Sequence, residues 1–397
     1  MSEVVETDSQ ALNHLLTEAA VDWAGLSAEV ARQADAALGG VCSALIIDES
    51  AFAKKGSASA GVARQWNGRL GKVENSQVGV FAALCRGGRV TLLDSRLYVP
   101  LSWRRDKRRC QRARIPEAAR RFRSKCDLAL DLVDGAVRHR VRFGYVAVDG
   151  GYGKDPAFLR ALEARSLCFV ADVHKAQRIW LSDPEPAVPM GRGRGRPATK
   201  RRTDVPPQTV AQWAARQPAS AWKRISLRPG EKGTLRAEFL HTQVWVWDGK
   251  EEKARRWRLL VRRECGAKTP SHYVLSNAEA AVSVGRLARM HASRFFIEHA
   301  FREAKSELAM ADYQVRRWDA WHRHMALVMI AMLFLVKERL MLQEEAPLLS
   351  LSDLVLVLYQ LLPRPDPTPD QVAAIIEARH RRRRAAMAGY RRREVGM

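Results

Sequence analysis

The sequence predicts an α/β fold with a mixed sheet, and three observations support that prediction. Two short apolar runs, Ser43–Asp48 and Phe143–Asp149, each end in an acid, the pattern of a buried strand. Two further strand patterns, Gln77–Cys85 and Arg89–Tyr98, are joined by Arg86–Gly88, which is a hairpin signal. Helical segments follow these strands, an order that favours an α/β core. The chain has 397 residues, so two or three structural units are expected.

The first half of the chain supplies most of this core. Residues 9–38 have helical periodicity, which ends at Gly39–Gly40. Residues 52–75 are rich in Gly, Lys, Arg and Asn and predict a long turn. Trp103–Ile115 predicts a basic loop, because seven Arg or Lys lie within residues 104–114. The remaining elements of this half are a helix from Pro116 to about Arg138, a helix from Pro156 to about Arg165 and a strand over Leu167–Val173.

The second half predicts a β-rich insertion followed by helices. Residues 181–221 favour a loop, and residues 222–278 contain four strand patterns without a helix signal. Helices are expected over about 282–343 and 349–362, and the tail carries eight Arg between Arg379 and Arg393. The expected organisation is an N-terminal helical segment (1–40), the first part of the core (41–180), the β-rich insertion (181–280), core completion with a Glu-bearing helix (281–345), and a C-terminal helix, linker and basic tail (346–397).

The composition points to a polyanionic partner. The chain has 67 Lys and Arg against 43 Asp and Glu, a net charge of +24, which favours nucleic acid. The longest apolar run, Met325–Val336, is too short to span a bilayer, and no secretory signal is visible at the start. The six cysteines form no CxxC pair and no cluster with zinc spacing, so free thiols in a reducing cytosol are expected.

Two acids at the ends of predicted strands are candidate catalytic residues. Asp48 and Asp149 end the two apolar runs, and the end of a buried strand is where an α/β sheet presents functional groups. Asp is also a common cap or turn residue at such positions, so each acid taken alone has a purely structural interpretation.

A third acid lies on a predicted helix. At about 100° per residue, His291, Arg294, Glu298 and Lys305 fall within about a 60° arc. An apolar stripe runs beside this arc: Ile297, Phe301, Ala304 and Leu308. The alternative interpretation is a solvated helix face with an Arg294–Glu298 pair.

Together the three acids suit a two-metal site. Hard cations such as Mg²⁺ prefer oxygen ligands, and two ions about 4 Å apart can promote phosphodiester chemistry. Arg294 and Lys305, on either side of Glu298 along the helix, could then hold phosphates on both sides of the cut bond.

Several motifs carry a resemblance to a known family. They are Ile46–Gly56, Gly61–Val80, Leu97–Trp103, Val148–Gly153 and the spacing Arg294-x3-Glu298-x6-Lys305. With them the sequence, from about residue 8 to about 345, resembles insertion-sequence transposases of the DDE class, which have a ribonuclease-H-like catalytic fold. The last motif resembles the family's tyrosine-arginine-glutamate-lysine signature, with His291 at the tyrosine position. The 149 positions between Asp149 and Glu298 fit the branch that carries a β-rich insertion.

The resemblance implies a function and a set of site residues. Asp48, Asp149 and Glu298 would bind two Mg²⁺ ions, for which Mn²⁺ can substitute, and would cleave transposon ends and join their 3′-hydroxyls to target DNA. The implied DNA contacts at the transposon end are Arg294 and Lys305, with the contact of His291 left open. The implied partners are double-stranded DNA, as transposon end and target, and a second copy of the chain in a paired-end complex. The implied location is the bacterial cytoplasm, in association with the nucleoid.

Two further basic or aromatic features have two interpretations each. Arg192, Arg194 and Arg196 lie in a Gly-Arg repeat that resembles an arm for the DNA minor groove, or is a flexible basic loop. Trp222, Trp245 and Trp247 are candidates for holding a flipped base, as the family branch implies, or are core residues. Three functions stay open: an active transposase, a truncated non-catalytic remnant that occupies transposon ends, and a basic RNA-binding protein.

Overall fold

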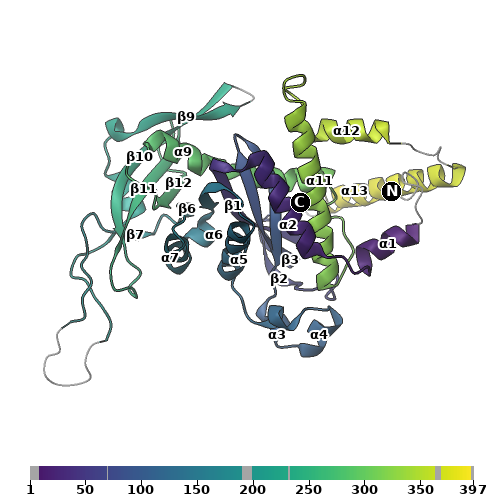
Figure 1. Ribbon diagram of the computed structural model, residues 1–397, viewed down its shortest axis with the longest axis horizontal. Helices are drawn as coiled ribbons and strands as arrows, with labels where there is room; N and C mark the ends of the chain where they lie inside the picture. The colour runs from purple at the N-terminus through teal and green to yellow at the C-terminus, as the bar shows by residue number, and fades with distance from the viewer. Residues whose placement is uncertain (1–8, 69, 190–198, 231–232, 363–367, 395–397) are drawn as a thin grey trace. The chain divides into compact units, whose positions relative to one another are not determined.

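The computed structural model describes residues 9–68, 70–189, 199–230, 233–362 and 368–394 (Figure 1). The contacts within the chain divide it into two compact units. The large unit, residues 16–354, contains both sheets. The small unit comprises residues up to 15 and from 355 onward. Its described parts are helical and come from α1 (Ser9–Thr17), α12 (Leu351–Leu361) and α13 (Pro369–Glu394). The predicted basic tail is therefore helical over most of its length.

The core sheet has five strands in the order β4-β3-β1-β5-β6. They are β1 (Gly40–Ala53), β3 (Lys72–Arg86), β4 (Arg89–Leu97), β5 (Phe143–Val148) and β6 (Phe169–Val173). β1, β3 and β4 pair antiparallel, whereas β1, β5 and β6 run parallel. This is the order and direction of a ribonuclease-H-like sheet, so the predicted fold class is confirmed.

Helices cover this sheet. In chain order these helices are α2 (Trp23–Leu38), α5 (Lys125–Arg138), α6 (Gly150–Gly153), α7 (Pro156–Ala164) and α11 (Trp318–Met341). α2 and α11 pack against each other and against β4, while α5 packs against β3. α5 begins where it does because Ser124 and Asp127 form a reciprocal capping box.

The insertion extends the core sheet rather than forming a separate layer beside it. Its main strands are β9 (Lys223–Gly230), β10 (Gly233–Val246), β11 (Arg255–Glu264) and β12 (His272–Ser276). β12 pairs antiparallel with β6, so one sheet runs continuously from the core to β9 (Figure 1). Before these strands lie the small pair β7 (Arg178–Ile179) and β8 (Gln208–Thr209) and the short helix α8 (Val210–Ala215). The helix α8 occupies part of a segment for which the sequence predicts a loop.

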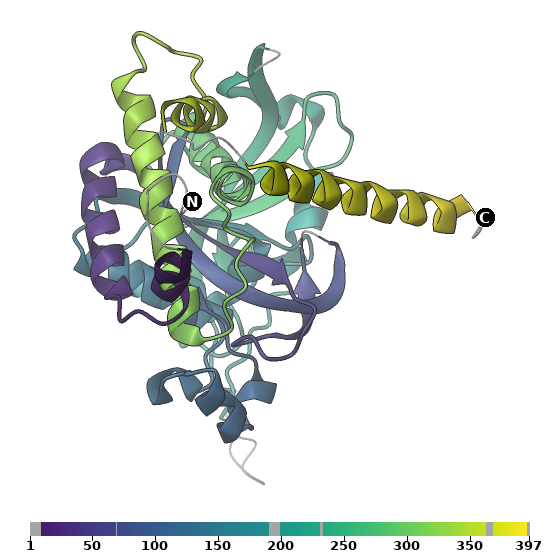
Figure 2. The same cartoon turned by 90° about the vertical axis from the view of Figure 1, so that its right-hand side faces the viewer.

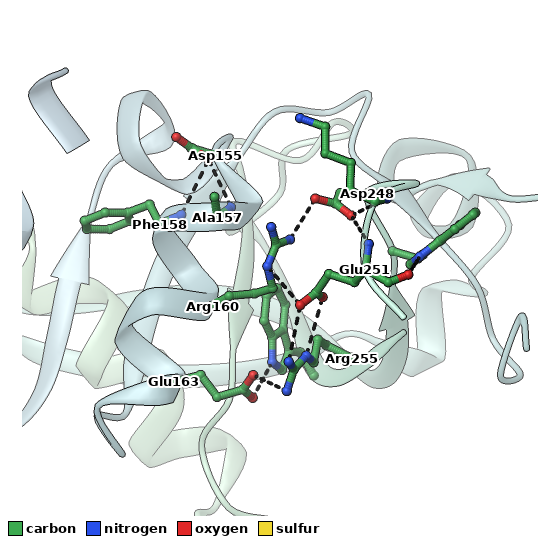
Figure 3. A network of polar contacts seen from close by, with 11 residues as sticks. Asp155, Ala157, Phe158, Arg160, Glu163, Asp248, Glu251 and Arg255 are labelled. Atoms are coloured by element: carbon green, nitrogen blue, oxygen red, sulfur yellow. Dashed lines mark hydrogen bonds and ion pairs between the residues drawn. The ribbon is translucent and has the colours of Figure 1, made fainter. Parts of the chain in front are cut away.

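A network of ion pairs joins the insertion to α7 (Figure 3). Arg160 Nη1 lies 2.8 Å from Asp248 Oδ2, and Arg160 Nε lies 3.0 Å from Glu251 Oε1. Arg255 lies 3.2 Å from Glu251 and 3.3 Å from Glu163. The acids of the β10–β11 connection are thus held by an arginine of the core.

Replacing Arg160 with Ala is expected to lower the free energy of unfolding by roughly 2 kcal/mol, because two partly buried carboxylates lose their shared cation. The matched control is Arg32→Ala, whose pair with Glu29 is exposed and should contribute little to stability. Denaturant titration of both variants measures the difference. Equal effects would show that the network contributes no more than a surface pair.

The structure corrects three local predictions in the first half of the chain. The long turn predicted for residues 52–75 contains the end of β1 and the strand β2 (Ala63–Asn67), which pairs with β3. The basic loop at 103–115 contains α3 (Leu101–Arg104) and α4 (Lys107–Arg112), a segment that projects from the core in both views (Figures 1 and 2). The helix predicted from Pro116 to about Arg138 starts later than expected: residues Glu117–Arg120 form a short 3₁₀ turn, and α5 covers only Lys125–Arg138.

Long-range contacts account for these departures. β2 forms because β3 offers it a partner, although its own composition predicts a turn. The α3–α4 segment is ordered because Trp103 is fully buried and donates a hydrogen bond of 2.7 Å from Nε1 to the carbonyl of Val62. The guanidinium of Arg109 stacks over the Trp103 ring at 3.7 Å. Among the described residues, no helix is long and apolar enough to cross a membrane.

Candidate active site

Two of the candidate acids lie on neighbouring parallel strands. β1 and β5 stay paired as far as Ile47 and Val148, and the next residue along each strand is Asp48 and Asp149, respectively. Asp149 follows the end of β5, as the sequence predicts. Asp48 does not end its strand, because β1 continues to Ala53 through its pairing with β3. Only the pairing with β5 ends there.

Asp149 caps a helix with one carboxylate oxygen and keeps the other oxygen available. Its Oδ1 accepts hydrogen bonds from the amides of Gly151 (2.9 Å) and Tyr152 (3.3 Å), which caps α6. Its Oδ2 accepts no hydrogen bond from any residue the structure describes. The cap therefore fixes the carboxylate and leaves one oxygen for a ligand.

Asp48 is buried beside other negative charges. Its side chain accepts a hydrogen bond of 2.7 Å from the amide of Glu49. Burial, with the charges of Asp149 and Glu298, raises the pKa of Asp48 to about 7, against the opposing effects of the Glu49 amide and Arg294. A bound cation would relieve both the burial cost and the repulsion, so these acids fit a divalent metal site.

The third acid comes from the second of two consecutive helices. α9 (Val284–Ser293) and α10 (Phe295–Glu307) meet at Arg294, which keeps helical backbone angles. Glu298 lies in the first turn of α10 with about half of its side chain exposed. Arg294 Nη1 lies 3.0 Å from Glu298 Oε1 and 3.8 Å from Asp48 Oδ2. The Arg294–Glu298 ion pair, which was the alternative interpretation of this helix, is present, and its arginine also lies near Asp48 of the sheet.

Arg294 is the central cation of this cluster. Its side chain is only 17% exposed, and its Nε lies 3.1 Å from Oδ2 of a fourth acid, Asp172 on β6. Burial opposes the charge of the guanidinium, but the four carboxylates Asp172, Glu298, Asp48 and Asp149 raise the pKa of Arg294 above its ordinary value. The arginine therefore stays protonated and links β1, β6 and α10.

Asp172 and His272 are site residues that the sequence did not predict, and His291 was expected only as a possible DNA contact. Asp172 Oδ1 lies 2.8 Å from His291 Nε2 and 3.5 Å from His272 Nδ1, and the ligand-type atoms of all three lie within 4.8 Å of one another. Burial alone would raise the pKa of Asp172, but hydrogen bonds from His272 and His291 and the charge of Arg294 hold it well below its usual range. The available signal was an acid inside the apolar run Phe169–Val173.

The remaining predicted DNA contacts have different surroundings. His291 is buried, which lowers its pKa, and its ring contacts Asp172 through Nε2. Lys305 Nζ lies 5.3 Å from the centre of the Phe52 ring and lines, with Glu298, a cavity of about 470 Å³. Arg192, Arg194 and Arg196 lie outside the described residues.

The Gly-rich turn after Asp149 is explained by close backbone contact. A Cβ on Gly153 would lie 1.9 Å from the carbonyl oxygen of Asp172, so α6 can approach β6 only with glycine there. Gly153→Ala is expected to lower the free energy of unfolding by roughly 1–3 kcal/mol through overpacking. Gly56→Ala is the control, because a Cβ there meets nothing within 4 Å. Equal melting temperatures of the two variants would contradict this packing argument.

Comparisons with known proteins found a matching family model and a similar solved structure. A family model described as DDE superfamily endonuclease matches residues 1–234, a range that includes Asp48 and Asp149. A solved structure, the NurA nuclease from Sulfolobus solfataricus, is similar at 11% identity and a TM-score of 0.30, covering 88% of this chain and 97% of that chain. That level of similarity supports no argument about function. No curated protein matches the chain.

Proposed function

Because the chain belongs to the DDE superfamily endonuclease family, we propose that it is a DNA transposase that cleaves transposon ends and joins their 3′-hydroxyls to target DNA. The observation that supports this proposal is the clustering of acids around one arginine. Arg294 contacts Glu298 and lies near Asp48, while Asp48 is influenced by the charges of Asp149 and Glu298. Four separate elements contribute to the cluster, which argues against a chance surface pair.

Asp48, Asp149 and Glu298 are the proposed holders of two Mg²⁺ ions, for which Mn²⁺ can substitute. When bound, such ions supply Lewis-acid activation of the attacking oxygen and stabilisation of the leaving oxygen. The chain itself orients the ligands: the α6 amides fix Asp149, and Arg294 holds Glu298 toward the sheet. The burial of Asp48 excludes water from its side of the site.

The basic residues of the signature are proposed to act on the DNA in different ways. Lys305 lines the same cavity as Glu298 and Arg302, where it can receive a phosphate beside the cut bond. Arg294 already forms ion pairs with Asp172 and Glu298, so its proposed main role is to hold Glu298 in place. It would contact a phosphate only through the exposed part of its side chain. His291 supports Asp172, which in turn holds Arg294.

The proposal is tested with a linear DNA that carries the sequences flanking the coding frame. Mg²⁺-dependent cleavage at those ends, followed by joining of the freed 3′-ends to a second DNA, is the expected result. Cleavage without joining would limit the protein to an endonuclease. Binding of the ends without cleavage would favour the non-catalytic alternative. A shift from monomer to dimer on adding the DNA tests the proposed paired-end complex.

A further inference from the structure

The large unit contains a second cavity, which is lined by arginines and lies away from the acids. It has a volume of about 710 Å³ and lies between α9, the end of β9 and the β3–β4 hairpin. Its lining includes Cys42 and Tyr145, which lie near the amino ends of β1 and β5. Asp149 follows Tyr145 by four residues, which is about 13 Å along an extended strand. The cavity and the catalytic candidates thus occupy opposite ends of the same parallel strands.

The arginines that line this cavity have no carboxylate partner among the described residues. Its lining includes Arg228, Arg286 and Arg289 and contains no Asp or Glu. None of the three forms an ion pair with any residue in the described part of the chain, and Arg228 Nε is buried without a hydrogen-bond partner. On α7, by contrast, Arg160 has two carboxylate partners. Three like charges around one cavity repel each other, and a bound anion would relieve that repulsion.

The same cavity has an aromatic wall. Phe296 lines it, and the guanidinium of Arg228 lies 5.1 Å from the Phe296 ring centre and 4.5 Å from that of Phe295. Gly88 of the hairpin leaves room for the ring, because a Cβ there would lie 3.1 Å from Phe296 Cζ. Leu227 and Met290 add apolar surface. A phosphate backbone alone would need no such wall, whereas a nucleic acid base can stack on it.

We infer that this cavity binds a nucleotide of single-stranded DNA, with its base against Phe296 and its neighbouring phosphates on Arg228, Arg286 and Arg289. The inference rests on the proposed function in so far as DNA is the ligand. The distance from the acids assigns the cavity to holding a strand, not to cutting it. Arginines provide the salt-dependent part of the affinity, and stacking provides the part that distinguishes a single strand from a duplex.

The test is fluorescence anisotropy of the full chain with a labelled single-stranded oligonucleotide and with a duplex of the same sequence. Phe296→Ala is expected to weaken single-strand binding about tenfold, from the loss of one stacked base, with duplex binding little changed. Phe296→Tyr should restore it. Arg286→Ala with Arg289→Ala should reduce the salt slope for the single strand by about 1.4 units, at about 0.7 for each lost phosphate contact.

The matched control removes the same charge elsewhere, by Arg104→Ala with Arg105→Ala on the exposed α3–α4 segment. If both double variants weaken single-strand binding equally, or if Phe296→Ala binds like the unmodified chain, the inference is refuted. A deoxynucleoside monophosphate that competes as well as the oligonucleotide would identify a free nucleotide and overturn the assignment to a strand. Melting temperatures establish that each variant is folded. End cleavage is measured separately, so its absence counts against the proposed function and not against this cavity.

Discussion

Asp48→Asn, Asp149→Asn and Glu298→Gln are each expected to lower Mg²⁺-dependent DNA cleavage by at least about 10³-fold and to leave DNA affinity within a few-fold. Each change removes a carboxylate charge from the proposed metal site, and the lost transition-state stabilisation of about 4 kcal/mol corresponds to that factor. The phosphate contacts come from basic residues that stay in place. Single-turnover cleavage with saturating protein measures the chemical step apart from binding.

Asp48→Asn also has an expected effect on stability that separates loss of function from loss of fold. The pKa of Asp48 in the folded chain is about 7, above the value of about 3.9 for an unfolded Asp. Ionisation of this group therefore costs stability progressively as the pH rises from about 4 to about 7. In metal-free buffer at pH 8 the Asn variant should melt at the same temperature as the unmodified chain or above it, and this advantage should disappear near pH 4.

The control for this series is Asp204→Asn, an exposed acid of the insertion, which should cleave at the unmodified rate. Full cleavage by any of the three site variants would count decisively against the metal-site assignment. A large fall in the melting temperature of Asp48→Asn at pH 8 would show instead that the carboxylate stabilises the fold.

DNA affinity is expected to fall by roughly 10⁴ between about 50 and 200 mM salt, if the protein neutralises about eight phosphates. Because the net charge is +24, counterion release should supply most of the binding free energy. Lys305→Ala should reduce the salt slope by about one unit and slow cleavage of bound DNA, because a displaced phosphate loses its alignment. Arg294→Ala should change the slope less, since carboxylates already compensate its charge, and should slow cleavage more.

Deleting residues 369–397 provides the contrast for the salt experiment. This segment carries the eight tail arginines on α13, so its loss should weaken binding to every DNA alike without slowing the cut in bound complexes. If Arg294→Ala and Lys305→Ala cleave bound DNA at the unmodified rate, both are ordinary surface charges. A salt slope near zero would exclude the backbone-dominated mode of binding altogether.

The local sequence predicted the parts of the candidate site that depend on short-range pattern. The apolar runs before Asp48 and Asp149 form neighbouring parallel strands. Of the stripe beside Glu298, Ile297, Phe301 and Ala304 lie on the buried face of α10, whereas Leu308 is its C-cap. Periodicity of two or 3.6 residues is a property of adjacent residues, so one sequence suffices to detect it. The separate motifs also carried the family resemblance, with which the family model agrees over residues 1–234.

Only the tertiary structure decided which charged groups meet. Asp172 on β6 and His291 on α9 are 119 residues apart, and their hydrogen bond exists because β12 and α9 return the chain to the edge of β6. The same return joins the β-rich insertion to the edge of the core sheet through the pairing of β12 with β6. It also places Arg294, an expected DNA contact, against the carboxylates of Asp172 and Glu298. Pairing between distant strands is set by the burial and hydrogen bonding of the whole sheet, which no local pattern of residues encodes.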